Sequence, residues 1–448
     1  MNIAMFARVC LGLVLLATIP AWSQVEPAAV GGDAPAEDNQ QMRTPPPVNG
    51  ADYPVVVGAE MRSNYLRGGL TYNTSYIDNL FAGNGNAAIA ETTFSVLSNI
   101  SLDETLPKQD ISLTYSPGFT FYQPSSALNE VDQSLNAAYQ YRLMPHMTVI
   151  ARDGFQKSST SYGSADSIDG GAVPEALQPL TPGIIAPFAE RLSNSASAKF
   201  SFQFSRMSMV GASGSLMKVD YPDQAESVGL FDSNERGCGA FYNRRISESQ
   251  YMGLTYQYSW ILSTPDGAES ETQINTLQGF YSIYLRRELS ISFSGGGQHY
   301  NVIQTSLPSS GAWGPSVMAS AGWQGQHFNA AASLSRQVTS GGGMLGVFQS
   351  DSANANLRWQ LARTWSAGVS GVYANNKSVT PLSFLYAEGG HSISGQVTVQ
   401  HALNKELNAN LEYDRIHENY GSIPAASDPD SDRVMISLAW QFERPLGR

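Results

Sequence analysis

The stretch "DRVMISLAWQFERPLGR" (432–448) ends the chain, and its core repeats with a period of two. Every second position carries an apolar or aromatic side chain: Val434, Ile436, Leu438, Trp440 and Phe442. The positions between them hold Met435, Ser437, Ala439 and Gln441. Because successive side chains of a β-strand point to opposite faces, this stretch predicts a strand with one apolar face.

The same alternation recurs along most of the chain. It is clearest in the ranges 111–121, 135–143, 196–204, 252–260 and 407–413, where aromatic and aliphatic residues oppose Ser, Thr, Asn and Gln. A helix would scatter these residues around its axis, so the chain is predicted to be all-β. From residue 66 onward the pattern predicts about 18 strands, within a range of roughly 16–20, and these include strands near 273–286, 315–324, 327–338, 352–362 and 433–443.

The spacers between the predicted strands alternate in length. Short ones such as "LMPHM" and "SRMS" follow long polar ones such as "STPDGAES" and "IPAASDPDS". Short turns on one side and long loops on the other are typical of a transmembrane, antiparallel, up-and-down β-barrel. In such a barrel the last strand must pair with the first, near residues 66–76, to close the wall.

Composition favours a membrane barrel over a soluble sandwich. The chain has 448 residues, a net charge of −12 and 14% charged residues, below the roughly 25% typical of soluble domains. The polar face of the strands consists mostly of small uncharged residues, which suit a watery lumen. The acidic balance and the lack of basic runs argue against a nucleic-acid partner.

The N-terminal part is predicted to lie outside the barrel. An apolar run after Arg8 ends at "AWS", with small residues suited to cleavage before Gln24, so residues 1–23 are predicted to be a secretory signal peptide. Residues 24–62 have the Pro-rich composition of a disordered periplasmic linker. The barrel is predicted to span residues 63–448, and removal of the signal peptide leaves Cys238 as the only cysteine.

Two stretches also resemble a known class of protein. The closing strand, which finishes on Phe442, resembles the C-terminal assembly signal of outer-membrane proteins, and "ISLTYSPGFTFYQPSSALNEVDQSLNAAYQYRLMPHMTVIARDGFQKSS" (111–159) resembles porin-like barrels of diderm bacteria. The resemblance implies a location in the cell outer membrane. It also implies contacts with outer-membrane lipid, lipopolysaccharide and the barrel-assembly machinery, and by analogy a homotrimer.

If the apolar faces meet lipid, the opposite faces line the pore. The residues predicted to line it are Arg67, Arg142, Lys199, Arg245, Arg286, Arg358, Glu412 and Asp414. Lys199 and Arg358 are expected near mid-strand, and the other four cations near the periplasmic rim. Cations facing carboxylates across a channel would bias ion selectivity; alternatively, these side chains form ion pairs that stiffen the wall.

Loops supply further expectations. The 157–194 loop carries enough apolar residues to fold inward and constrict the pore, and residues 53–61 could act as a plug, form an added strand or simply belong to the segment that leads into the barrel. "GGGMLG" (341–346) is expected in a loop without the strand–helix context of a phosphate site. The acidic external loops either share divalent cations with lipopolysaccharide or are simply solvated.

No catalytic or metal-binding pattern stands out. The six histidines show no HExxH, nucleophile elbow or Cys/His cluster, and the side chains of His391 and Ser392 diverge on a strand. The chain is therefore predicted to be no enzyme and to need no cofactor or metal. The predicted function is passive diffusion of small hydrophilic solutes. The alternatives are an exporter or dedicated channel for an extracellular polysaccharide, and a structural or adhesive barrel whose lumen is blocked by loops.

Overall fold

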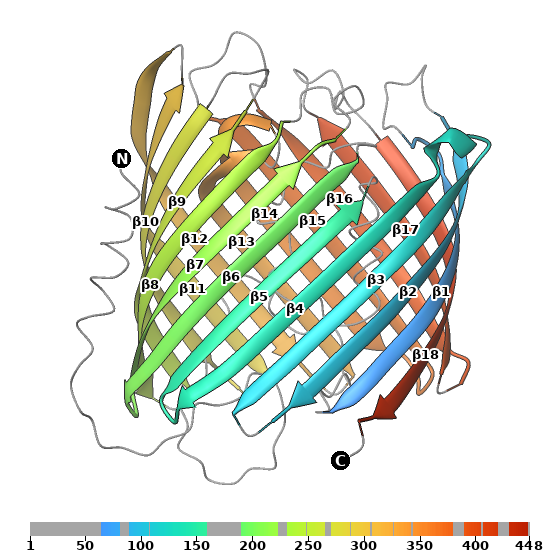
Figure 1. Ribbon diagram of the computed structural model, residues 1–448, viewed down its shortest axis with the longest axis horizontal. Coiled ribbons are helices and arrows are strands. Elements are labelled where there is room, and N and C mark those ends of the chain that lie inside the picture. The colour runs from blue at the N-terminus through green and yellow to red at the C-terminus, as the bar shows by residue number, and fades with distance from the viewer. Residues whose placement is uncertain are drawn as a thin grey trace.

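The computed structural model is a single closed β-barrel (Figure 1). It describes residues 64–80, 89–106, 108–158, 190–222, 231–247, 249–264, 270–286, 288–304, 307–325, 327–341, 344–379, 389–404, 406–419 and 430–446. The predicted signal peptide, the linker with its 53–61 segment, and most of the 157–194 loop lie outside these residues.

Eighteen antiparallel strands form the sheet. They are β1 (Tyr65–Ile77), β2 (Glu91–Thr105), β3 (Gln109–Gln123), β4 (Glu130–Met144), β5 (Met147–Ser158), β6 (Arg191–Ser205), β7 (Ser208–Asp220), β8 (Ser233–Ser247), β9 (Gln250–Ser263), β10 (Ser270–Tyr284), β11 (Leu289–Gln304), β12 (Leu307–Gln324), β13 (Phe328–Gly341), β14 (Met344–Gln360), β15 (Trp365–Ser378), β16 (Gly389–Ala402), β17 (Leu407–Asn419) and β18 (Asp430–Pro445). One short 3-10 helix, η2 (Ser126–Leu128), lies between β3 and β4.

Each strand pairs with its neighbours in the chain, and β18 returns to β1. The closing register runs from Tyr65 opposite Pro445 to Ile77 opposite Arg433. This pairing confirms the prediction that the last strand seals the wall against the first. Because closure leaves the sheet without an edge, backbone N–H and C=O groups of the wall can be satisfied inside the sheet, as a bilayer requires.

The two rims of the barrel differ. Strand β1 begins and strand β18 ends at the lower rim in Figure 1, which we call the short-turn rim. The strands are also joined there by short segments, such as 145–146 between β4 and β5 and 361–364 between β14 and β15. In the described part of the chain, no helix is long and apolar enough to cross a membrane.

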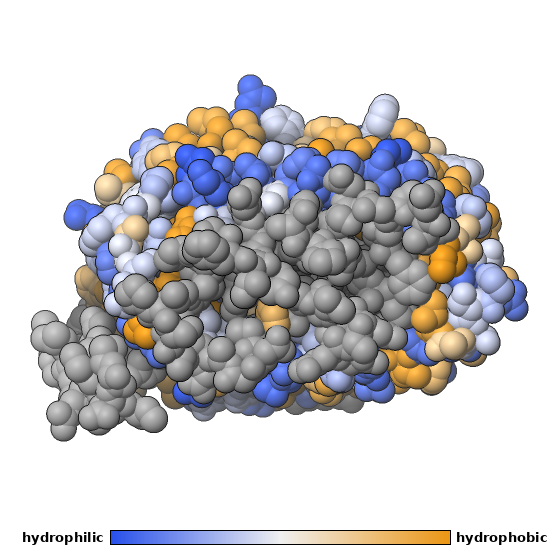
Figure 2. Space-filling view, turned by 90° about the horizontal axis from the view of Figure 1, so that it is seen from above, coloured by the Kyte–Doolittle hydropathy of each residue, from blue (hydrophilic) through white to orange (hydrophobic). Residues whose placement is uncertain are grey.

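The two faces of the wall differ as the alternation predicts. On β1, Leu70, Tyr72 and Tyr76 are exposed, whereas Asn73 and Ser75 between them are buried on the inner side. Cross-strand partners share a face, so this parity carries around the whole barrel through the register. Seen from the other rim, the barrel is wider than it is deep, with apolar residues along its outer wall (Figure 2).

At β11 to β14 the strands are longer than expected. The sequence suggested long loops before residues 315 and 352, but β12 begins at Leu307 and β14 begins at Met344. Only residues 305–306 separate β11 from β12, and only 342–343 separate β13 from β14. The expectation that "GGGMLG" lies in a loop was therefore wrong, since β13 and β14 run into it. Stretches rich in Gly and Ser are typical of loops, but here such residues belong to β12, β13 and β14 and pair with the neighbouring strands.

Candidate functional site in the barrel lumen

The outer face of the closing strand is apolar and accessible. Ile436 is 63% exposed and Leu438 is 44% exposed, while Ser437 between them is 4% exposed. Trp440 lies outward near the short-turn rim, with its ring centroid 5.5 Å from that of Phe442. Exposed Trp359 and Trp365 lie at the same rim. Aromatic rings at one level of an apolar outer wall match an interfacial girdle.

Four of the six cations predicted to line the pore were expected near the periplasmic rim, and three of them lie on inward-facing positions. Arg67 of β1 forms ion pairs with Asp103 of β2 (3.1 Å) and Glu443 of β18 (3.3 Å). Arg142 lies opposite Thr148, and Arg245 lies opposite Tyr251, which is fully buried inside the wall. Arg67 thus supports the reading in which ion pairs stiffen the wall at the β1–β18 seam.

The fourth, Arg286, lies just beyond the end of β10. Its exposed side chain belongs to the turn between β10 and β11, where its backbone exchanges hydrogen bonds with Leu289. The sequence placed it on the wall because the strand was predicted to reach residue 286. It therefore lies at the mouth of the barrel and outside the row of wall residues.

Lys199 lies in the middle of β6, as expected. Its Nζ is 5.1 Å from the centroid of the Phe241 ring, which projects inward from β8. The ring lies directly over Gly211, which has no side chain. A Cβ at this position would come within 2.2 Å of Phe241 Cζ. A cation held over an aromatic face places fixed positive charge on this side of the lumen.

Arg358 occupies a different height from the one predicted. It is the third residue from the end of β14, so it lies near the short-turn rim and not at mid-strand. Its Nη2 donates to Gln400 Oε1 of β16 at 2.9 Å. The prediction failed because the strand was read as beginning at residue 352, eight residues after its real start.

The predicted acids Glu412 and Asp414 lie together on the inner face of β17. Arg433 of β18 bridges them, with Nη2 2.7 Å from Glu412 Oε1 and 2.7 Å from Asp414 Oδ2. All three side chains are more than nine-tenths buried. The sequence analysis did not count Arg433 among the pore-lining residues, although Arg433 begins the predicted last strand and has the inward parity of Met435.

The upper ends of β13, β14 and β15 turn into the lumen. Among the described residues, β12 pairs with β13 only between Val317 and Gln324, so the two strands separate above Arg336. Val338 of β13 and Val347 of β14 have the outward parity of their strands, yet both are almost fully buried. They pack on the inner wall of β9 to β11, in one apolar cluster with Ile261, Ile274, Tyr300 and Val302.

A side chain from the wall fixes this inward bend. Gln298 of β11 donates from Nε2 to the carbonyl of Val338 at 2.8 Å and accepts from its N–H at 2.7 Å. The N–H of Val379, just after β15, donates to the carbonyl of Val347 at 3.0 Å. We call the segment formed by residues 338–341, 344–348 and 376–379 the inward flap, and it narrows the lumen on the side of β9 to β11.

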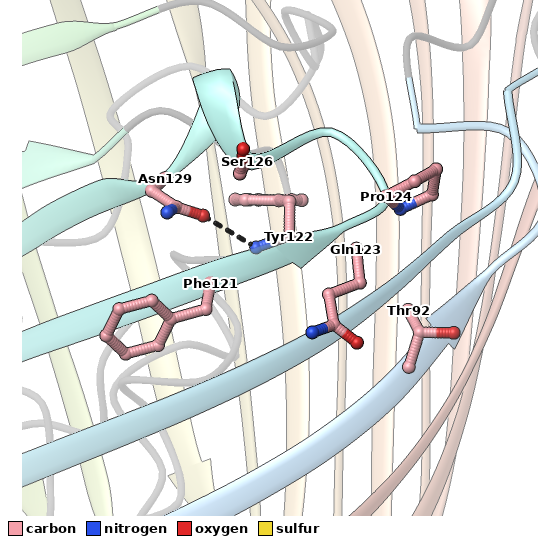
Figure 3. A pocket seen from close by; sticks show the side chains of 7 residues that line it. All are labelled: Thr92, Phe121, Tyr122, Gln123, Pro124, Ser126 and Asn129. Atoms are coloured by element: carbon pink, nitrogen blue, oxygen red, sulfur yellow. Dashed lines mark hydrogen bonds between the residues drawn. The ribbon is translucent and has the colours of Figure 1, made fainter.

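The pocket of about 670 Å³ shown in Figure 3 lies at the rim opposite the short-turn rim. Asn129 Oδ1 accepts from the Tyr122 backbone N–H at 2.9 Å, and the Tyr122 hydroxyl donates to Glu130 at 2.7 Å. The buried carboxylate of Glu91 accepts from both the backbone and the hydroxyl of Ser125. These hydrogen bonds attach the β3–β4 connection to the wall. We therefore assign these side chains a structural role.

In the described parts of the chain, no three His, Cys, Asp or Glu side chains come together as a metal site. No family model matches the chain, and no curated protein matches it.

Solved structures do match its shape. OccK2 (OpdF) of Pseudomonas aeruginosa in complex with glucuronate is 11% identical, with a TM-score of 0.45, and 85% of this chain covers 100% of that one. The outer membrane protein OpdK of Pseudomonas aeruginosa is 10% identical, with a TM-score of 0.42, and coverage is 85% and 99%. OccAB4 of Acinetobacter baumannii is 9% identical, with a TM-score of 0.42 and the same coverage. The closed sheet of 18 antiparallel strands, its apolar outer face and its polar inner face are observed in the structure itself, and by its fold the chain is a closed antiparallel β-barrel.

Proposed function

We propose that the chain is an outer-membrane channel for passive diffusion of small hydrophilic solutes. The observation that carries this proposal is the opposition of the two faces in a closed wall: Ile436 and Leu438 outside, Ser437 and the Glu412–Asp414–Arg433 cluster inside. Barrels of 16–18 strands leave an aqueous interior. The predicted signal peptide would direct the chain out of the cytoplasm.

The inward flap supports a limit on solute size. Because it is held by an apolar cluster and by two hydrogen bonds from Gln298, it occupies part of the lumen as a fixed element. The sequence assigned a constriction to the 157–194 loop, which lies outside the described residues apart from its ends. The flap is a separate element that the alternation pattern did not indicate.

Charge inside the barrel is mixed in sign, and this weighs against the polysaccharide-exporter alternative. A conduit for a charged polymer would carry one sign along its length, whereas this lumen pairs Arg67 with Asp103 and Arg433 with two carboxylates. Contacts with lipid, lipopolysaccharide and the assembly machinery, and a homotrimeric state, remain predictions, as does the absence of catalysis.

Single-channel recording in planar bilayers tests the proposal. The purified chain should give stepwise conductance, and reversal potentials in a salt gradient should report its ion preference. An absence of conductance from a preparation that shows heat-modifiable gel migration would refute the channel and favour a blocked structural barrel. Conductance that only a polymer blocks would favour the exporter.

A further inference from the structure

The outer face of β15 and β16 changes from apolar to polar at one level. Tyr373 of β15 and Ile393 of β16 are direct cross-strand partners, and they are 40% and 46% exposed on the outer wall. The next outward pair is Asn375 and His391. Asn375 is ten positions along β15 from Trp365 at the short-turn rim, which at about 3.3 Å per residue and a tilt of about 40° is a height of roughly 25 Å. That height equals the apolar band of an outer-membrane barrel, about 25 Å, so Asn375 and His391 lie where the lipid headgroups begin.

Lys377 continues this outer face above the headgroup level. Its side chain is exposed and has the outward parity of Tyr373 and Asn375, and β15 still pairs with β16 here, with Lys377 opposite Gly389. Within the described part of the chain, no ion pair or hydrogen bond engages its ammonium group. His391 is its diagonal neighbour on β16, within reach of a long side chain. An ammonium, an amide and an imidazole therefore gather on one patch of the outer wall.

The outward carboxylates of the flanking strands already have cations of their own. Asp351 of β14 accepts two hydrogen bonds from the Arg336 guanidinium, at 2.5 and 2.6 Å. Asp430 and Asp432 of β18 each lie 3.5 Å from the Arg415 guanidinium of β17. Among the described lysines and arginines that face outward at this level from β13 to β18, Lys377 is the one that no carboxylate engages. Its positive charge is therefore available to an anionic group in the membrane.

Below this polar patch the outer wall has a notch. Gly371 of β15 and Gly395 of β16 are direct cross-strand partners on the outer face, and a Cβ added at Gly395 would meet no atom within 4 Å. The residues above and below Gly371 on the same face of β15 are bulky: Tyr373 is 40% exposed and Val369 is 49% exposed. A hydrocarbon chain can therefore approach the backbone between these two rows and gain dispersion contacts on both sides.

We propose that the outer face of β15 and β16 binds one phosphorylated glycolipid of the outer leaflet, that is, a molecule of lipopolysaccharide. A headgroup phosphate accepts from the Lys377 ammonium and the Asn375 amide, and a sugar hydroxyl exchanges a hydrogen bond with the His391 ring. An acyl chain of the same molecule lies in the notch between Gly371 and Gly395. The inference rests on the proposed function only for the membrane and for the orientation of the barrel, with the short-turn rim toward the periplasm.

The test is native mass spectrometry of the full-length protein in detergent, with diphosphorylated lipid A, dephosphorylated lipid A and phosphatidylglycerol as probes. The wild type should retain one diphosphorylated lipid A and should bind the other two lipids more weakly. Lys377→Gln should weaken lipid A binding about fivefold, the factor expected for the loss of one interfacial cation, and Lys377→Arg should preserve it. Gly395→Trp, which fills the notch and leaves the charge unchanged, should also weaken binding.

Lys218→Gln is the matched control, since it removes an outward lysine near the upper end of β7 that already pairs with Asp220 at 2.6 Å. It should leave lipid A binding unchanged. Equal binding by the wild type and Lys377→Gln, equal losses in Lys377→Gln and Lys218→Gln, or equally tight binding of phosphatidylglycerol would overturn the inference. Heat-modifiable gel migration checks that each variant is folded. Conductance in bilayers of phosphatidylcholine, which contain no lipopolysaccharide, tests the channel separately, so either proposal can fail while the other stands.

Discussion

A charge introduced at Leu438 tests the facing of the wall at the seam. Leu438 lies near the middle of β18, between Tyr72 of β1 and Ala409 of β17, and its side chain is 44% exposed on the outer face. A strand rises about 3.3 Å per residue, and strands of membrane barrels are tilted by about 40°. Leu438 therefore lies roughly 5 Å from the level of Trp440, well inside an apolar band about 25 Å tall.

Leu438→Lys should lower the free energy of unfolding by about 1–3 kcal/mol, because this level lies between the midplane, where a cation costs about 2–4 kcal/mol, and the interface, where it costs about 0–1 kcal/mol. The measurement is urea unfolding of the protein in lipid vesicles, followed by tryptophan fluorescence. Gln441→Lys is the matched control, because Gln441 lies on the same strand, faces inward and is already exposed. That change should alter the free energy of unfolding by less than about 0.5 kcal/mol.

Ser437 is a poorer control than its sequence suggests. It faces the lumen, but its neighbours leave it only 4% exposed, so a lysine there would have to displace packed side chains. The comparison therefore depends on Leu438 and Gln441. Equal losses at these two positions would refute the assigned facing, and with it the membrane orientation of the whole wall.

Three further predictions follow from the lumen. Arg433→Met should destabilise the barrel by about 3–5 kcal/mol in the same unfolding assay, because it leaves Glu412 and Asp414 buried side by side without a cation; a loss below 1 kcal/mol would contradict this account. Val338→Asp should release the inward flap, raise single-channel conductance and admit larger sugars in liposome swelling, whereas an unchanged size limit in a heat-modifiable, folded variant would show that the flap does not constrict the pore. Lys199→Gln should shift the reversal potential toward cation preference and Lys199→Arg should not, since only the first removes positive charge from the lumen; equal potentials in both variants would place Lys199 outside the ion path.

The period-two alternation was enough to predict the faces of the wall and the pairing of its ends. Within each strand, apolar side chains such as Leu438 indicate the face that meets lipid, and polar ones such as Ser437 indicate the face that lines the lumen. Closure of the sheet follows because an open sheet edge is not tolerated in lipid. Strand ends were less predictable. Arg358 was placed at mid-strand because the Gly- and Ser-rich residues before position 352 resemble loop, and Arg433 was not counted among the pore-lining residues because it precedes Val434, where the clear alternation begins.

The inward flap shows what alternation cannot encode. The alternation along their strands predicts that Val338 and Val347 face lipid. Above Arg336, however, β13 separates from β12 and passes on its inner side. The bend converts an outward apolar face into one that packs on Tyr300 and Val302, so the flap is stabilised by the same residues that would otherwise face lipid. Gln298 then supplies the polar half of the contact, by replacing at Val338 the backbone partner that β12 no longer offers. A pairing lost between two strands is thus regained from a side chain of a third, and that exchange is what allows a wall strand to enter the lumen.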